Sequence, residues 1–431
     1  MRRVERWNAR KQLFAHSSLQ STKVFFMNPA RLSVKSGLSL LCDPAMTAGL
    51  IAFLTPICVL YIPLSLAVIL PVGTILLLVC RFVMGRPKFK IDLLPSIAIG
   101  GMLAVVVLSV FWSYASELTL DRLPRTVIAV FAGVVFINTV KGLDDRSARI
   151  FSRCFLASML LVLVLIMLEN LFGGMLLRYS RTAESGVFFL NQFNRPLSIL
   201  SVLIWPVVVI LARWHWGLAI AAIVIYLACL PFFINIAAFA AIAIGAVIFA
   251  VVYMLPKTGS LIVGVTLASM IVAAPTIDHI LPTPKTLFET LKLPRSTYHR
   301  LLIWDFTTQR IAERPVLGWG FNTSRQMPDG GKRLDVSEQA LPLHPHNAAL
   351  QWRLELGILG ALFGAAIVLV STDMARRYAA DRVARAGAVA SIGATYVIAM
   401  ISFGAWQTWW VSGMFLIAGT TVLVCRRRSP E

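Results

Sequence analysis

Residues 46–83, MTAGLIAFLTPICVLYIPLSLAVILPVGTILLLVCRFV, decide the fold class. The stretch carries no charged side chain before Arg81. A membrane helix needs about 20 mainly apolar residues to cross a hydrocarbon core of about 30 Å. A single straight helix over the whole stretch would overshoot the bilayer, and Pro63 stands near its middle. We therefore expect two membrane spans, 46–62 and 63–83, joined with almost no loop.

The rest of the chain repeats this apolar pattern. Of the 431 residues, 58% are hydrophobic and 14% are charged, against roughly 45–50% and about 25% in soluble domains. The apolar runs are continuous rather than alternating, which argues against a β-barrel. We predict an all-α polytopic membrane protein with about twelve spans, the other ten lying at 93–113, 122–140, 150–173, 195–212, 216–233, 234–254, 258–276, 346–372, 385–404 and 406–425.

The positive charge follows the expected topology. The net charge is +20, which in a soluble protein would suggest a nucleic-acid partner. With the N-terminus in the cytoplasm, 25 of the 40 lysines and arginines fall on the cytoplasmic side, including nearly every strongly basic short loop. We therefore expect no nucleic-acid partner. The tails 1–45 and 426–431 are both predicted to be cytoplasmic, with spans one to nine in 46–276 and spans ten to twelve in 346–425.

Residues 277–345 form a long polar loop between spans nine and ten, on the predicted outer face. Four of the six histidines lie in or beside this loop, and long ordered loops are usually functional. Within it, RSTYHRLLIWDFTTQRIAERP (295–315) predicts a helix with Ser296 as its N-cap and Pro315 as its stop. The helix is expected to lie on the membrane surface, with an apolar face made by Leu301, Leu302, Trp304 and Ile311.

The loop runs into LPLHPHNAALQWRLELGILG (341–360), where His346 and Asn347 stand at the mouth of span ten. Histidine titrates near neutral pH, so His346 could accept or donate a proton in catalysis. In the alternative interpretation, Asn347 only caps the helix and His346 is an interfacial polar residue. A metal site with His344 and His346 as ligands is a third reading, but no third ligand is evident nearby, and no cysteine pair has metal-ligand spacing.

Arginines stand on the same predicted outer face. Arg195 lies at the start of span six in FFLNQFNRPLSIL (188–200), and Arg300 lies on the loop helix. Two guanidinium groups could clamp a phosphate or diphosphate, because each offers a planar fork of donors; alternatively, Arg195 only snorkels. Arg353 and Glu355 lie just inside span ten, where charges are costly and therefore indicate a function or a local pairing.

These motifs together resemble the signature of a known family. HRLLIWDFTTQRIAERPVLGWGFN (299–322) contains an Arg-x-x-x-Trp helix and a Pro-x-x-Gly-x-Gly turn. HPHNAALQWRLELGILG (344–360) contains His-Asn-x-x-Leu-Gln and Glu-x-Gly-x-x-Gly. In this order, with about twelve spans and a long loop between spans nine and ten, they resemble the O-antigen ligase and O-antigen polymerase superfamily of bacterial inner-membrane glycosyltransferases. The resemblance implies a GT-C-like helical fold and a periplasmic loop.

The resemblance also implies a reaction, in which a glycan moves from undecaprenyl diphosphate to an acceptor hydroxyl, with inversion and with neither a metal nor another cofactor. Arg195 and Arg300 match the outer-face arginines of the family and would stabilise the diphosphate leaving group. His346 matches the loop histidine and would accept the proton of the hydroxyl or orient that hydroxyl. Supporting roles fall to Asn347, Glu355, His344 and Trp304.

Three functions stay open at the level of sequence. A ligase would use lipid A–core as its acceptor, and the Asn-Arg segment around Arg195 favours this reading. An O-antigen or exopolysaccharide polymerase would use a glycan acceptor, and some relatives glycosylate proteins instead. A transporter or flippase of lipid-linked sugars is the alternative outside the family. The glycosyltransferase interpretation requires Arg195, Arg300 and His346 to converge at one outer site.

Overall fold

The computed structural model of this chain is helical throughout the part it describes, with two isolated β-bridges. Residues Pro44–Glu431 form one compact unit. Within the described ranges, the prediction of an all-α membrane protein is confirmed. These ranges are 42–85, 92–174, 193–230, 235–276, 280–334 and 338–426, so most of the two predicted tails lies outside them.

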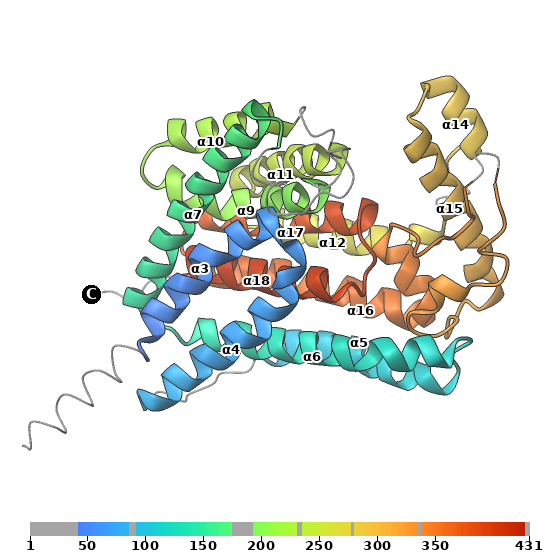
Figure 1. Ribbon diagram of the computed structural model, residues 1–431, viewed down its shortest axis with the longest axis horizontal. Helices are drawn as coiled ribbons and strands as arrows, with labels where there is room; N and C mark the ends of the chain where they lie inside the picture. The colour runs from blue at the N-terminus through green and yellow to red at the C-terminus, as the bar shows by residue number, and fades with distance from the viewer. Residues whose placement is uncertain are drawn as a thin grey trace, which may run out of the picture. The chain divides into compact units, whose positions relative to one another are not determined.

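Ten helices in the described ranges are long and apolar enough to cross a membrane (Figure 1). Each coincides with one of the expected spans. They are α3 (Pro44–Tyr61), η1 with α4 (Pro63–Ser65, Leu66–Val83), α5 with η2 (Leu93–Leu108, Ser109–Phe111), α6 (Ser116–Lys141), α7 (Asp145–Leu171), α9 (Asn194–Ala212), α11 (Ile236–Met254), α16 (Ala348–Tyr378), α17 (Arg382–Ile401) and α18 (Thr408–Cys425).

The two remaining apolar helices are shorter than predicted. α10 (Trp216–Cys229) and α12 (Gly259–Val272) have 14 residues each, which gives a length of about 21 Å at 1.5 Å per residue. They stand where spans seven and nine were expected, at 216–233 and 258–276. The predicted pattern of apolar helices is therefore confirmed, but these two do not reach the length of a full span.

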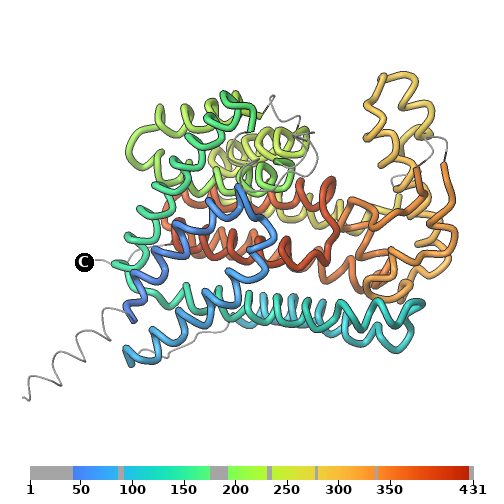
Figure 2. The backbone as a smooth tube through the Cα atoms, in the orientation of Figure 1, coloured from blue at the N-terminus to red at the C-terminus, as the bar shows by residue number. Residues whose placement is uncertain are grey.

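The core of the helical unit is built around α9. Hydrophobic side chains surround α9, and nearly all of its residues are buried, as expected for a helix without a lipid-facing side. α17, α10, α11 and α18 pack against it, while α3 packs against α7 and α16 packs against α12 and α5 (Figures 1 and 2). Arg195, the second residue of α9, is therefore carried by the most enclosed helix of the bundle.

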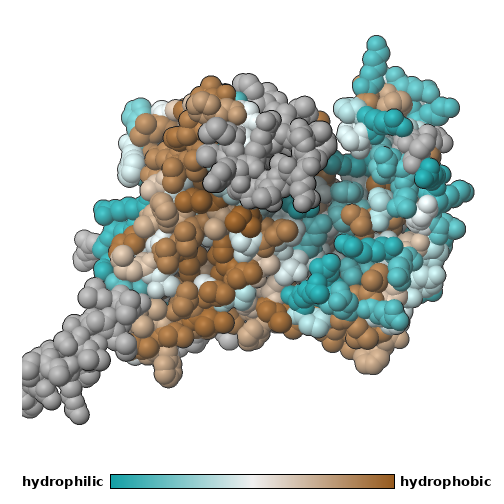
Figure 3. Space-filling model, in the orientation of Figure 1, coloured by the Kyte–Doolittle hydropathy of each residue, from teal (hydrophilic) through white to brown (hydrophobic). Residues whose placement is uncertain are grey.

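The outer helices leave large apolar side chains uncovered, as lipid-facing helices do. Phe82, Ile97, Phe131 and Val164 are among the exposed residues on four different helices. Figure 3 shows this hydrophobic surface in brown over α3, α4 and α7, whereas the surface over α14 and α15 is mostly hydrophilic. The hydropathy of the surface thus separates a membrane-facing bundle from the long polar loop.

The loop contains α14 (Pro284–Leu291), α15 (Arg295–Glu313) and η6 (Thr323–Gln326). α15 confirms the predicted helix and ends just before Pro315. The expected N-cap is wrong, because Ser296 lies inside the first turn and Pro294 occupies the cap position. The buried face also differs from the expected one: Leu301, Leu302 and Trp304 are only partly buried, and the buried residues are Tyr298, Ile303, Thr307, Thr308 and Ile311.

Candidate active site

The helix α16 is interrupted at Gly357, where the turn 315–320 docks against it. The amide of Ile358 donates to carbonyls of the turn, those of Pro315 and Val316, both at 3.2 Å. In the opposite direction, the carbonyls of Leu354 and Glu355 accept from the turn amides of Trp319 at 2.9 Å and Gly320 at 2.8 Å. The turn therefore supplies hydrogen-bond partners to the helix backbone where the helix is interrupted.

Two glycines make this docking possible. Gly357 has a φ of 64° and Gly318 has a φ of 71°, a region that side chains with a Cβ rarely adopt. A Cβ on Gly357 would stand 1.9 Å from the Val316 oxygen, and a Cβ on Gly318 would stand 2.5 Å from the Glu355 carbonyl carbon. The Pro-x-x-Gly-x-Gly turn and the Glu-x-Gly motif are thus two halves of one backbone joint.

The carboxylate of Glu355 lies fully buried beside this joint. It accepts hydrogen bonds from the turn, from its own helix and from the α17–α18 connection. The donors are the amides of Asn322 (2.7 Å) and Ser324 (3.4 Å), the Ser324 hydroxyl, the Gln351 side-chain amide (3.1 Å) and the Trp406 indole (2.7 Å). Five donors to one carboxyl group engage both of its oxygens, so Glu355 is not free to contact a substrate. Glu355 therefore connects α16, the segment 322–324 and the α17–α18 connection.

The histidine segment is held from three sides. The indole of Trp304 donates to the Pro345 carbonyl at 2.9 Å, and the Nδ1 of His346 lies 2.8 Å from the Ser402 carbonyl oxygen. The ring centroids of His344 and His346 lie 4.2 Å apart, and the His346 amide donates to the Nδ1 of His344 at 3.1 Å. His346 has a φ of 55°, a left-handed conformation held by these contacts.

These contacts fix the protonation of both rings. A carbonyl only accepts, so the Nδ1 of His346 carries the hydrogen and its Nε2 keeps a lone pair. Burial, followed by the positive charge of Arg300 and the proximity of His299, lowers the pKa of His346, against the opposing effect of the Ser402 carbonyl. Burial and the neighbouring His346 lower the pKa of His344 to about 3. Near neutral pH, His346 is therefore a neutral imidazole that can accept a proton at Nε2.

Asn347 has the role given by the alternative interpretation. Its side-chain oxygen accepts from the Leu350 amide at 3.1 Å, which makes it the N-cap of α16. The ring of His346 bonds to Ser402, 56 residues further along the chain. Asn347 thus fixes the start of the helix, and His346 faces a tertiary partner.

The connection between α17 and α18 is the part of the site that sequence reasoning missed. Segment 402–409, SFGAWQTW, was assigned almost wholly to the predicted spans 385–404 and 406–425. In the structure α17 ends at Ile401 and α18 begins at Thr408, and the residues between them contact residues of the sequence motifs one after another. Beyond the contacts of Ser402 and Trp406, the Ala405 amide donates to Gln351 at 2.8 Å and Gln407 lies 3.3 Å from His344. The tryptophans and polar residues next to Gly404 were the sequence feature that could have indicated this connection.

The two predicted arginines approach the histidines differently. Arg300, on α15, is partly buried, and burial lowers its pKa; its charge acts on both His344 and His346. Arg195 is exposed at the start of α9, with its guanidinium 5.7 Å from the Trp409 ring centroid. Trp409 stacks edge-on against Phe403, next to Ser402. Arg195 therefore borders the same α17–α18 connection, but among the described residues no hydrogen bond joins it to Arg300 or His346.

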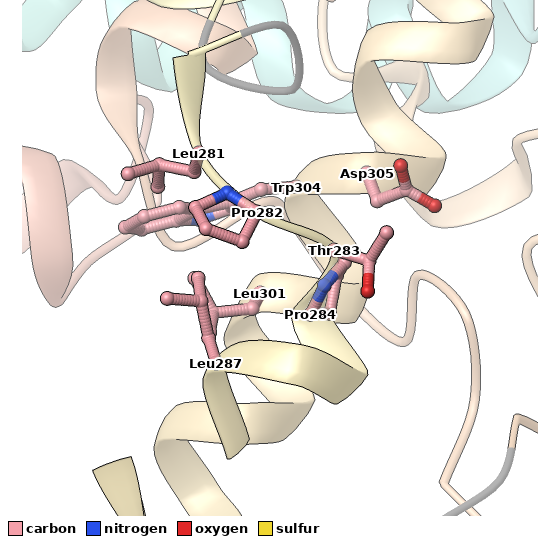
Figure 4. Close-up of a pocket in the computed structure, with 8 residues that line it drawn as sticks. All are labelled: Leu281, Pro282, Thr283, Pro284, Leu287, Leu301, Trp304 and Asp305. Carbon is pink, nitrogen blue, oxygen red and sulfur yellow. The ribbon is translucent and has the colours of Figure 1, made fainter. Parts of the chain in front are cut away.

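A small cavity of about 120 Å³ lies on the other side of Trp304, between α14 and α15. Figure 4 shows the Trp304 ring beside Leu281 and Pro282, with the Asp305 carboxylate on the opposite side of the opening. Ligand pockets usually measure about 300–1,000 Å³, so this cavity is too small for a lipid-linked glycan. It gives the Trp304 ring a partly open face and does not replace the histidine segment as the candidate site.

Comparison with known proteins identifies the motif-bearing segment. Residues 221–365 match the family described as O-antigen ligase, and this segment contains the loop, the histidines and the interrupted helix. The match covers about a third of the chain, so over this segment the chain is similar to the O-antigen ligase family. Three relatives carry the name "putative polysaccharide ligase": those of Rickettsia conorii (27% identity; 79% of this chain, 83% of the relative), Rickettsia prowazekii (29%; 61% and 65%) and Rickettsia bellii (32%; 52% and 56%).

The matched segment and the rest of the candidate site are distinct stretches of chain. His346, Arg300 and Glu355 lie inside residues 221–365, whereas Arg195 and the connection 402–409 lie outside. The connection 402–409 contacts the histidine segment and Glu355 from outside the matched stretch. The apolar helices indicate a multi-pass membrane protein, and its relatives carry the name of polysaccharide ligases.

Proposed function

We propose that this protein transfers a glycan from undecaprenyl diphosphate to a hydroxyl of lipid A–core at the periplasmic face of the bacterial inner membrane. The observation that carries the proposal is the neutral His346, whose Nε2 is left as an acceptor beside the cationic Arg300. A base and a cation at one outer site fit a reaction that releases a proton and an anionic leaving group. The ligase names of the relatives favour a ligase over a polymerase.

In this proposal, the acceptor oxygen attacks the anomeric carbon from the face opposite the diphosphate. A carbon–oxygen bond to the acceptor forms as the bond to the diphosphate breaks, which inverts the configuration. The proton of the acceptor hydroxyl moves to the Nε2 of His346. Arg300 and Arg195 stabilise the negative charge that collects on the diphosphate, so the step needs no metal ion.

The remaining predicted residues act through these groups. Trp304 holds the Pro345 carbonyl and so fixes the segment that carries His346. His344 accepts the His346 amide, and Asn347 begins α16. Glu355 joins the turn, the helix and the α17–α18 connection. All four are positioning residues in the proposal.

The proposed orientation follows from the lysine and arginine distribution. It places the loop 277–345 in the periplasm and both termini in the cytoplasm. The candidate site then lies on the side where lipid A–core and the lipid-linked glycan are both accessible. This placement agrees with the hydrophilic surface over α14 and α15.

The test is a lipopolysaccharide gel on a deletion strain, run together with an assay for undecaprenyl-linked polymer. A ligase predicts loss of the long-chain ladder while lipid-linked polymer accumulates. Core carrying a single repeat would instead identify a polymerase. Loss of exopolysaccharide with an unchanged gel would identify a different acceptor, and unchanged surface glycans would contradict glycosyl transfer altogether.

Complementation with His346→Ala tests the proposed base. The variant should insert normally and leave the ladder absent, because it lacks the proposed proton acceptor. His215→Ala is the matched control, since His215 caps α10 at the opposite end of α9. A full ladder from His346→Ala would refute the assignment of the base.

A further inference from the structure

A second cavity, lined by arginines, lies between α7 and α9, far from the candidate active site. Its volume is about 200 Å³. The lining residues are Arg149, Ser152, Arg153, Leu156, Ile210, Arg213 and Trp214. Three guanidinium groups around one cavity favour an anion as its ligand.

The position of this cavity separates it from the histidine site. It lies beside the first turns of α7 and just after the end of α9. Arg195 stands at the other end of α9, and the 19 residues of this helix span about 28 Å. The cavity is therefore at the opposite membrane face and serves no step of the proposed transfer.

The arginines differ in how firmly they are held. Arg213 donates to the Val424 carbonyl at 3.0 Å and pairs with Asp381 at 3.2 Å, so it is tied into the bundle. Arg153 is exposed and makes no hydrogen bond or ion pair with the residues that the structure describes. Asp381 offsets the charge of Arg213 and Arg149 also has a partner, so the exposed Arg153 is the guanidinium group of this cavity that stays available to an anion.

Neighbouring residues place the cavity at the depth of lipid headgroups. Trp214 is 67% exposed and Trp216, two residues further on, is 41% exposed; tryptophan gathers at membrane–water interfaces. Leu156 and Ile210 give the cavity an apolar wall. An anion at this depth with an apolar neighbour is a lipid phosphate, and basic pockets between membrane helices bind such headgroups.

Ser152 refines the chemistry of the ligand. Its hydroxyl donates to the Ala148 carbonyl at 2.8 Å, so within the cavity its oxygen can only accept. The phosphate oxygens must therefore be bound by the guanidinium groups, while Ser152 suits a hydroxyl on the headgroup. We propose that this cavity binds the phosphate of an anionic glycerophospholipid with a hydroxylated headgroup, of the phosphatidylglycerol type.

The test measures lipid retention by the full-length chain, purified in neutral detergent, using native mass spectrometry. Phosphatidylglycerol should bind more tightly than phosphatidylcholine. Arg153→Gln should weaken phosphatidylglycerol binding roughly five-fold, because each arginine near an anionic lipid contributes about that factor. Lys257→Gln is the control: it removes one exposed positive charge from the α11–α12 connection at the same membrane face, outside the cavity.

Three outcomes would overturn the proposal. Equal binding of phosphatidylglycerol and phosphatidylcholine would show that the cavity does not select an anion. Equal effects of Arg153→Gln and Lys257→Gln would assign the binding to general surface charge. Displacement of the lipid by inorganic phosphate at millimolar concentration would make the ligand a soluble anion rather than a lipid.

Discussion

The carbonyl oxygen of Val316 lies 1.9 Å from the point where a Cβ on Gly357 would stand. At this point the turn of the loop packs against the interrupted helix α16 too closely to leave room for a side chain on residue 357. Gly357→Ala should therefore lower the free energy of unfolding by about 2 kcal/mol or more, from the clash and from the positive φ. Melting temperatures in detergent measure this, with Gly100→Ala as the control, because a Cβ at Gly100 would meet nothing within 4 Å. Equal melting temperatures for the two variants would contradict this account of the joint.

Glu355→Gln should destabilise the protein even though the side chain keeps its size. The carboxylate accepts from five donors, and an amide NH₂ would face one or more of them without an acceptor. The expected loss is about 1–3 kcal/mol of unfolding free energy. Chemical denaturation measures it, with the exposed Glu338→Gln as the control. A stability equal to that of the control would mean that the carboxylate network does not support the fold.

Trp304→Phe should reduce transfer more than it reduces stability. The change keeps an aromatic ring but removes the hydrogen bond to the Pro345 carbonyl, so the His346 segment loses a restraint. We expect about 1 kcal/mol of lost stability and a transfer rate lowered about ten-fold. Trp112→Phe removes a comparable indole–carbonyl bond, to Leu317, and serves as the comparison. If both variants lose transfer equally, Trp304 has no special role at the histidines.

Acidification should destabilise the protein through His344. Its pKa is about 3 when folded and about 6.5 when unfolded, so between these values the unfolded chain binds one more proton. Stability therefore falls as the pH decreases from about 6.5 towards 3. His344→Gln should lessen the difference in melting temperature between about pH 7.5 and about pH 5, although His346 retains part of it. An unchanged pH dependence in the variant would show that His344 is not buried in its neutral form.

The pH dependence of transfer should report His346. Its pKa is lowered, chiefly by burial, and the proposed base must be neutral to accept a proton. The acid limb of the rate should therefore have its midpoint below the ordinary histidine value of about 6.5. Rates in membrane vesicles with a purified lipid-linked donor measure this profile. A midpoint above 6.5 would indicate that a different group controls the rate.

Much of the fold was predictable because a membrane helix can be recognised from the length of its run of apolar residues. Ten long apolar helices overlap the expected spans, and the loop helix ended before Pro315 as expected. α10 and α12 were harder, since apolar composition does not show where a helix stops inside a hydrophobic run. The prediction of Ser296 as the N-cap was wrong because Pro294, whose φ is fixed by its ring, starts the helix two residues earlier.

The residues of the candidate site stay a prediction from the sequence motifs, and the contacts between them could be foreseen only in part. His346, Trp304 and Glu355 carry motif spacing that the sequence displays. Ser402 and Trp406 contact them across long sequence separations, and no local pattern encodes such tertiary pairs. Whether Arg195 joins Arg300 around a diphosphate likewise depends on a ligand rather than on chain geometry, and it stays a proposal.

The interruption of α16 also bears on how this protein enters its membrane. The carbonyls of Leu354 and Glu355 accept hydrogen bonds from the loop that precedes the helix. In the proposed topology, a span ten that formed before residues 315–320 had docked would lack these donors, and an unsatisfied peptide group in lipid costs several kcal/mol. We therefore expect insertion of this span to be coupled to the docking of the turn.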